Sequence, residues 1–308
     1  MLDITVGLRA PHDMSGGAAW LRGFVAQVEA ARIDRLCVGD HVTFKGGQGF
    51  DGLLTAAALA AVSDRITVQT SVYLLALRHP VPVARQLASL AELAPGRLVF
   101  GIGLGGEDPA ELRACGVDPA TRGARLNETL AVLRALATGT EVSMSGRFFQ
   151  LNQVSIRPAP QPPVPIVIGG RSDAALRRVA RYGDGWLGLW VSPSRYADAV
   201  ERIGRYASDA GRDVLRWQHG MHVWCGIGPS PQIAQARLRA LMEEFYQLAF
   251  SKFERYCPCG TPGQIAESLQ AYVAAGCRSF NLIPVAGSQQ EAIAAADAVR
   301  AALREESR

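Results

Sequence analysis

Lysine is nearly absent from this chain of 308 residues, since it occurs only as Lys45 and Lys252. The net charge is a mild +4, and the 32 basic and 28 acidic residues are spread along the chain. We therefore expect no nucleic-acid partner, because such partners need a concentrated basic surface. An apolar run of about 18 residues is also missing, so no membrane span is expected. The N-terminus lacks the basic and apolar regions of a signal peptide, which predicts a cytoplasmic protein.

The sequence also lacks the spacings that are typical of metal sites. The five histidines show no H-E-x-x-H pattern, and no pair of cysteines forms C-x₂-C. Only Cys257 and Cys259 are close together, and Cys37 lies in an apolar run, where it is expected to pack as a small core residue. The sequence therefore predicts no metal and six structural or unreactive thiols.

Short apolar segments alternate with longer segments of helical period along most of the chain. These short segments are apolar on both faces, which favours a buried parallel sheet within an α/β fold. The predicted strands are Ile4–Arg9, Arg35–Gly39, Ile66–Ser71, Arg97–Ile102, Ile166–Gly169, Gly185–Leu189, His219–Ile227 and Ser279–Pro284.

Two architectures fit this alternation, a doubly wound open sheet and a barrel. An open dinucleotide-binding sheet would carry G-x-G-x-x-G after its first strand, whereas here Gly101 and Gly103 come with the fourth. Eight strands over about 280 residues fit the (β/α)₈ TIM barrel better. We expect one barrel domain over residues 1–308, with an irregular, proline-rich excursion at 142–165 and a helical insertion at about 230–256.

Two further segments carry local predictions. Thr261, Pro262 and Gln264 are expected to open a helix, as N-cap, first helical residue and closing member of a capping box. Arg122 and Arg125 precede Glu128 at helical spacing, which favours a salt-bridged helix face.

The active site of a TIM barrel lies where the strands end, so the residues there are the candidates for chemistry. They are Asp40 and His41 after strand two, Ser71 and Val72 after strand three, Gly103, Gly105 and Glu107 after strand four, and Ile168, Gly169, Gly170 and Arg171 at the end of strand five.

The end of the fifth strand has the composition of an anion site. Gly169 and Gly170 let the backbone approach a phosphate, Ser172 can cap the next helix, and Arg171 adds a cation. A tight strand-to-helix turn would also need these glycines.

Asp40 and His41 form the strongest catalytic candidate. A histidine titrates near neutral pH and can donate or accept a proton, although His41 could equally pack while Asp40 caps a turn. The glycines from 101 to 106 could admit a flat ring with Glu107 at its rim, or form a flexible loop.

Taken together, these motifs resemble the luciferase-like monooxygenase family over roughly residues 4 to 285. Each motif is weak alone, but their order and spacing are specific. They are Asp40-His41, Ser71-Val72, Arg78-His79-Pro80 with Pro95-Gly96-Arg97, Gly101 to Gly105, Arg122 to Glu128, Ile168-Gly169-Gly170 and Gly183-Asp184-Gly185-Trp186.

The resemblance implies a cofactor and roles for the candidate residues. The Asp-His pair is similar to the branch that uses coenzyme F420, a deazaflavin, whereas other members use FMN. By resemblance, His41 faces the substrate side of the ring, Asp40 contacts the cofactor, and Glu107 is a second acid–base residue. Ser71-Val72 matches a non-proline cis peptide behind the ring. The implied cofactor site consists of Asp40, Ser71, Val72, Gly103, Gly105, Ile168, Gly169, Gly170 and Arg171.

We therefore expect an F420-dependent oxidoreductase, by resemblance a homodimer, that transfers a hydride between the deazaflavin C5 and a small organic substrate. The alternatives are an FMN-dependent monooxygenase and a flavin-binding protein without turnover. Having only Lys45 and Lys252 argues against a sugar-phosphate substrate, because relatives that act on sugar phosphates carry additional basic residues. Trp186 and Trp190 are expected in the core, and Phe44, Trp190 and Phe250 are candidates for the wall of a substrate pocket.

Overall fold

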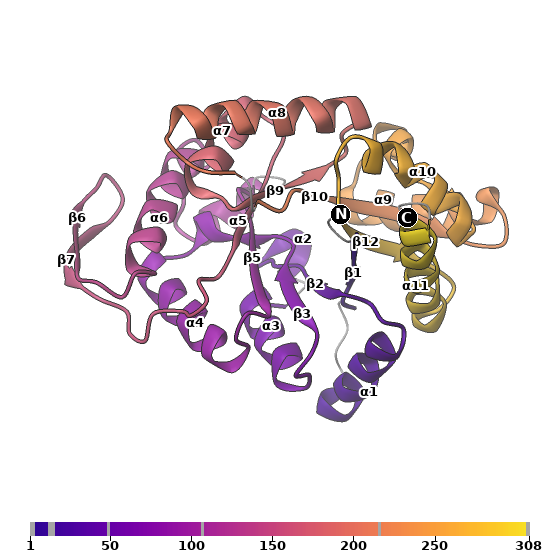
Figure 1. Cartoon of the computed structure of the whole chain (residues 1–308), viewed down its shortest axis with the longest axis horizontal. Coiled ribbons are helices and arrows are strands. Elements are labelled where there is room, and N and C mark those ends of the chain that lie inside the picture. The colour runs from indigo at the N-terminus through magenta and orange to yellow at the C-terminus, as the bar shows by residue number, and fades with distance from the viewer. Residues whose placement is uncertain (1–3, 12–15, 48–49, 106–107, 215–216, 306–308) are drawn as a thin grey trace.

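Eight parallel strands close into a barrel in the computed structural model, which describes residues 4–11, 16–47, 50–105, 108–214 and 217–305 (Figure 1). The predicted (β/α)₈ architecture is confirmed. Each strand pairs with its neighbours, and the β9–β10 pairing, with Gly220 opposite Leu187, completes the ring. In ring order the strands are β1 (Thr5–Arg9), β2 (Arg35–Val38), β3 (Thr67–Thr70), β5 (Leu98–Gly103), β8 (Ile166–Gly169), β9 (Gly185–Leu189), β10 (Gly220–Ile227) and β12 (Ser279–Val285).

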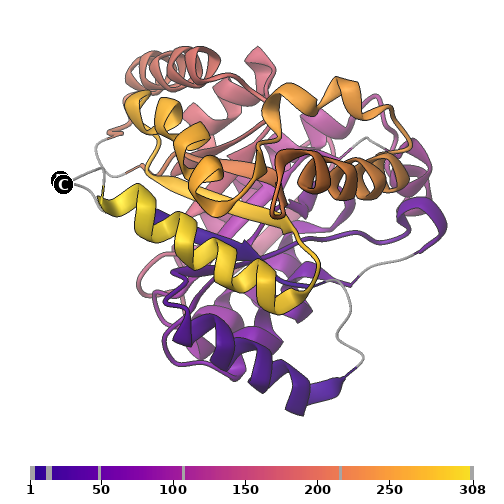
Figure 2. The same ribbon diagram turned by 90° about the vertical axis from the view of Figure 1, so that its right-hand side faces the viewer.

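Helices follow the strands and cover the outside of the barrel. Figure 2 shows α10 and α11 side by side along the outer surface. None of the helices in the described part of the chain is long and apolar enough to cross a membrane. The helices are α1 (Gly17–Ala30), α2 (Phe44–Gly47), α3 (Gly52–Ala61), α4 (Pro80–Leu93), α5 (Pro109–Ala114), α6 (Arg122–Leu136), α7 (Asp173–Tyr182), α8 (Pro193–Asp209), α9 (Pro231–Tyr246), α10 (Pro262–Ala274) and α11 (Gln289–Glu305), with single 3₁₀ turns η1 (Leu75–Leu77), η2 (Phe250–Lys252) and η3 (Glu254–Tyr256).

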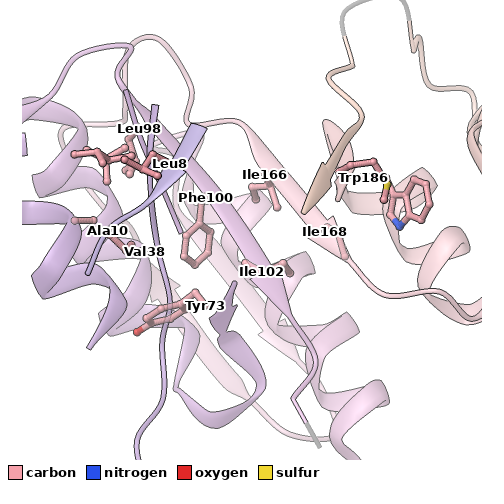
Figure 3. Packing of buried hydrophobic residues seen from close by; sticks show 14 of the residues in the cluster. Leu8, Ala10, Val38, Tyr73, Leu98, Phe100, Ile102, Ile166, Ile168 and Trp186 are labelled. Atoms are coloured by element: carbon pink, nitrogen blue, oxygen red, sulfur yellow. The ribbon is translucent and has the colours of Figure 1, made fainter. Parts of the chain in front are cut away.

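The core lies between the strands and the helices around them. Figure 3 shows Phe100, Ile102 and Ile168 of this core, and all three are fully buried. Cys37 is also fully buried, as expected of a small core residue, and all six cysteines are free. The burial of this apolar surface is the main favourable contribution to the stability of the barrel.

Buried polar side chains connect neighbouring strands of the barrel. The guanidinium of Arg35 on β2 donates to Gln69 Oε1 on β3 at 2.6 Å and to Ser279 Oγ on β12 at 3.1 Å. Burial lowers the pKa of Arg35. These hydrogen bonds join three strands, because buried polar groups must find partners to be tolerated.

The excursion at 142–165 contains an antiparallel hairpin, β6 (Val142–Ser145) and β7 (Gln150–Val154), which projects to the left of the barrel in Figure 1. Glu128 of α6 holds its turn. The carboxylate accepts hydrogen bonds from the backbone N–H groups of Arg147, Phe148 and Phe149 at 2.8–3.1 Å.

The predicted salt-bridged face of α6 is therefore wrong. Arg125 donates from Nε to the carbonyl of Ala76 at 3.0 Å and lies over the ring of Phe149, while Arg122 donates to the carbonyl of Pro119. Three backbone donors are better partners for Glu128 than a solvated arginine, since exposed ion pairs contribute little.

The segment after β10 forms α9, η2 and η3 and is followed by β11 (Cys259–Gly260). Leu238 and Met242 of α9 are fully buried, whereas its apolar residues Ile233 and Leu241 are exposed. The capping box of Thr261 and Gln264 at the start of α10 is present as predicted.

Candidate active site

A cavity of about 320 Å³ opens among the carboxyl ends of the strands. Its volume is in the range of small-molecule sites, and a TIM barrel places its chemistry at this end. Ile168, which the sequence also suggested, is fully buried in the core, and Glu107 lies outside the described residues. The predicted residues that line the cavity are Asp40, His41, Ser71, Val72, Gly103, Gly105, Gly169, Gly170 and Arg171.

Asp40 is held by four donors. Its Oδ1 accepts from the backbone N–H of Gly52 at 3.0 Å, and its Oδ2 accepts from that of Leu74 at 2.9 Å. Arg78 donates to both oxygens, at 2.6 and 2.7 Å, in a forked ion pair. The Asp40 side chain is completely buried, and that of Arg78 is 16% exposed. The pair thus joins the end of β2 to the start of α3 and to the residues after β3.

Burial raises the pKa of Asp40, although the charge of Arg78 and the two backbone N–H groups oppose this shift. These four donors already occupy both carboxylate oxygens, so Asp40 serves to hold the segments around it together. The structural alternative, in which Asp40 fixes a local turn, is consistent with the bond to Gly52 at the start of α3. Contact between Asp40 and a cofactor stays a prediction.

The peptide bond between Ser71 and Val72 is cis, as the resemblance implied. Val72 bulges toward the cavity and packs against β5, where a Cβ on Gly103 would collide with its Cγ2. Gly103 is therefore needed to make room for this bulge. The bulge and the bare backbone of β5 together form one wall of the cavity.

His41 has a carboxylate partner that the sequence analysis missed. Its Nδ1 lies 3.2 Å from Oε2 and 3.4 Å from Oε1 of Glu111 on α5. Glu111 is 3% exposed and also accepts the backbone N–H groups of Val42 and Thr43, at 2.6 and 3.2 Å. One buried carboxylate thus fixes both the His41 ring and the backbone after it. Glu111 stands 70 residues from His41 and had no motif to mark it.

Aromatic rings surround His41 and continue along one side of the cavity. Phe44 stacks on the imidazole with ring centroids 4.1 Å apart, and Phe245 of α9 lies at its edge at 6.5 Å. The last residues of α9, Phe245 and Tyr246, line the cavity together with Trp190 and Trp224. The insertion therefore contributes an apolar cover.

The expected aromatic residues divide between the cavity and the core. Trp190 lines the cavity instead of filling the core, because it follows β9 at the open end of the barrel. Phe250 does not reach it as suggested, since it is buried with Leu238 and Met242 in a separate apolar cluster under α9. Trp186 is a core residue as expected.

The turn after β8 is built around Gly170. Its φ of 115° is a conformation that side chains rarely adopt, and a Cβ there would lie 2.8 Å from that of Ala175. Trp186 donates from Nε1 to the carbonyl of Gly170 at 2.8 Å, and Ser172 Oγ caps α7 by accepting from the N–H of Ala175. The turn geometry alone requires this glycine, so phosphate binding stays a prediction.

One arginine precedes α7 and another lies within it. Arg171 is exposed and donates to the carbonyl of Trp190 at 3.3 Å. Arg178, which was not predicted, is buried and lines the cavity, while Asn127 accepts from its Nε at 2.7 Å. Burial lowers the pKa of Arg178. The helical spacing from Ala175, another lining residue, places Arg178 on the same face of α7.

These features fit a flat ring with an anionic tail. A Cβ on Gly169 would lie 3.6 Å from Val72 Cγ1 and so narrow the cavity between β8 and the bulge. The N-terminus of α7 carries a partial positive charge, and Arg171 and Arg178 add cations. In the described part of the chain, no cluster of histidine, cysteine and carboxylate side chains could hold a metal.

Several known proteins resemble this chain in sequence. The family model described as luciferase-like monooxygenase matches residues 5–255. An uncharacterized protein of Mycobacterium tuberculosis is 36% identical over 170 residues, 55% of this chain and 58% of its own length. The F420-dependent glucose-6-phosphate dehydrogenase of Beutenbergia cavernae is 33% identical over 172 residues, 54% of this chain and 51% of its own. The matched part thus spans little more than half the length of these relatives.

Solved structures share the fold over the whole chain. An F420-dependent secondary alcohol dehydrogenase in complex with an F420-acetone adduct has a TM-score of 0.85 and 19% identity, covering 98% of this chain and 99% of its own. The monooxygenase RslO1 from Streptomyces bottropensis has a TM-score of 0.82 and 19% identity, covering 99% and 100%. At these identities the likeness shows the fold alone.

The Asp40–Arg78 pair generates a stability prediction. Arg78→Met should lower the free energy of unfolding by about 3–5 kcal/mol, because it leaves a buried carboxylate without its counter-charge. Arg205→Met is the matched control. Arg205 Nε lies 4.0 Å from Glu201 Oε1 in an exposed ion pair. Its replacement should lower the free energy of unfolding by less than about 1 kcal/mol. Urea unfolding of both variants checks this, and equal small losses would contradict the architectural role of Arg78.

Proposed function

Because this chain belongs to the luciferase-like monooxygenase family, we propose that it is an F420-dependent oxidoreductase that acts on a small organic substrate. One observation carries the proposal. One cavity is lined by His41, which a buried carboxylate holds, by the Ser71–Val72 bulge, and by Arg171 and Arg178, which lie before and within α7. An acid–base group, a wall for a flat ring and a place for an anionic tail are the parts such a reaction needs.

The residues divide between holding the cofactor and handling the proton. Val72, Gly103 and Gly105 would lie against the ring. Gly169, Gly170, Arg171, Arg178 and the α7 N-terminus would bind its phosphate-bearing tail. F420 is favoured over FMN because it appears in the names of several curated relatives, and FMN is the alternative that binding measurements must test.

When bound, reduced F420 supplies a hydride from ring carbon C5 to an electron-poor C=C, C=N or C=O group of the substrate. His41 would then add the proton that completes the reduction, or remove it in the reverse direction. A carboxylate can only accept, so the Nδ1 that faces Glu111 carries a hydrogen. This leaves Nε2 as the atom of His41 that exchanges a proton with the substrate.

The aromatic cover supports the same reaction. Phe245, Tyr246 and Trp190 would exclude water from the reacting atoms, which strengthens the electrostatic interactions inside the cavity. The His41–Glu111 pair also argues against a binding protein without turnover, since a passive binding site needs no oriented proton donor. If Glu107 acts as a second acid–base residue, it would share the proton handling with His41.

Cofactor titration is the first test of the proposal. F420 should bind with a Kd of about 1 µM or tighter, equivalent to about −8 kcal/mol, and FMN should bind at least about tenfold more weakly. Trp190 and Trp224 line the cavity, so intrinsic fluorescence reports the binding. Tighter binding of FMN would reassign the protein to flavin chemistry on the same fold.

The second prediction concerns the positive charge of Arg171, which lines the cavity. Arg171→Glu should weaken F420 binding about tenfold or more, because it places a carboxylate beside the anionic tail. Arg181→Glu reverses an equally exposed charge at the far end of the same helix and should leave the affinity within about twofold. Equal effects would mean that only the overall charge of the protein matters.

The proton donor makes a third prediction. His41→Ala should retain F420 binding and lose about 10²–10⁴-fold in single-turnover rate, the usual contribution of general acid–base catalysis. Glu111→Gln should reduce the single-turnover rate by a smaller factor, because the imidazole of His41 stays in place without its negatively charged partner. A panel of activated enones and imines provides the substrate, and the melting temperature separates chemistry from stability. A folded, cofactor-loaded His41→Ala protein with a normal rate would remove His41 from the mechanism.

A further inference from the structure

The two arginines near the end of β8 differ in how deeply they are buried. Arg178 of α7 is 6% exposed, whereas Arg171, just before the helix, is exposed, and both line the cavity. Asn127 Oδ1 and the carbonyl of Gly123 accept hydrogen bonds from Arg178 at 2.7 and 3.4 Å. Both partners are neutral, so no carboxylate among the described residues balances this buried charge.

The nearest acid along the chain is Asp173, the first residue of α7, and other groups balance its charge. Arg177 Nε donates to its Oδ2 at 2.7 Å, Tyr206 donates to its Oδ1 at 2.6 Å, and Arg202 donates to the same oxygen. None of these four residues is among the described residues that line the cavity. The cavity arginines therefore await an anion from a ligand.

Arg171 is held at the rim of the cavity by Trp190. Its Nη1 donates to the Trp190 carbonyl at 3.3 Å, and its guanidinium carbon lies 5.7 Å from the centroid of the indole ring. These contacts are also neutral. Because Arg171 is exposed, water and salt screen its charge far more than they screen that of Arg178.

We propose that Arg178 binds the phosphodiester of F420 and that Arg171 binds a carboxylate farther along the same tail. The inference rests on the proposed function and divides its anion site into an inner and an outer contact. The tail of F420 continues beyond its phosphodiester into lactate and glutamate, so it carries negative charge at successive positions. One buried guanidinium balances the single charge of a diester, and the α7 N-terminus adds a partial positive charge. FMN ends at its phosphate and would leave the outer contact unused.

The inner contact has a consequence for the protein without ligand. A buried cation that lacks a counter-charge is destabilising. Arg178→Gln and Arg178→Met should therefore leave the melting temperature of the cofactor-free protein unchanged or raise it, although both remove the bond from Nε to Asn127. An arginine that merely joined α6 to α7 would show the opposite result.

Fluorescence titration with three ligands tests the division of the site. They are the deazaflavin with only its ribityl chain, its phospholactate form, and F420 with its glutamates. Arg178→Gln should lose the affinity gained from the first ligand to the second, about tenfold to hundredfold. Arg171→Gln should keep that gain and lose the smaller gain from the second ligand to the third, about two- to fivefold.

Two controls accompany these titrations. Arg181→Gln neutralises an exposed arginine at the far end of α7 and should change neither gain. Raising the salt concentration from about 0.05 to about 0.5 M should reduce the glutamate gain by a larger factor than the phosphate gain, because only the outer contact is exposed.

A folded Arg178→Gln protein that keeps the phosphate gain would overturn the inner contact. A lower melting temperature of both Arg178 variants without ligand would also overturn it, since Arg178 would then be structural. Loss of both gains in each of Arg171→Gln and Arg178→Gln would overturn the division. If FMN binds and no form of F420 does, the proposed function is wrong. An Arg178-dependent gain from riboflavin to FMN would then still support an inner phosphate contact, and a gain independent of Arg178 would overturn that contact too.

Discussion

The buried ion pair of Asp40 and Arg78 is the constraint on which the active end of the barrel depends. It ties the end of β2 to α3 through Gly52 and to the segment after the cis peptide through Leu74. His41 follows Asp40 directly, and Val72 comes two residues before Leu74. The acid–base group and the wall of the cavity are thus both positioned from one carboxylate, and a shift of that carboxylate would move both.

The two neighbouring residues of the Asp-His motif have different partners. Asp40 forms an ion pair with Arg78. His41 lies within hydrogen-bonding distance of Glu111, which also accepts the backbone N–H groups that follow the histidine. An acid beside a histidine in the sequence is not its partner here, because consecutive side chains at the end of a strand point in different directions. The orienting carboxylate comes from α5, after β5, so only the closed barrel brings the pair together.

Sequence patterns predicted the barrel well, and the site less completely. All eight strands were found because each is a short apolar run, and local rules found the cap at Thr261. Glu111 and Arg178 were missed because each acts through partners that lie far away in the sequence. Glu128 was misread because helical spacing cannot show that a hairpin some 20 residues later supplies backbone donors. The hairpin itself was hidden by a stretch rich in proline and poor in periodicity.

The scarcity of lysine in the sequence agrees with the use of arginine around the cavity. Among the described residues that line it, every permanently charged cation is an arginine. Asn127 and the carbonyls of Gly123 and Trp190 fix the two arginines near β8 through hydrogen bonds. A planar guanidinium can keep such bonds and still present N–H groups to an anion, which a lysine does less well. Near the end of β8, these fixed charges would orient an anionic cofactor tail. His41 at the end of β2 would then need only to carry a proton, because the arginines would already have set the geometry.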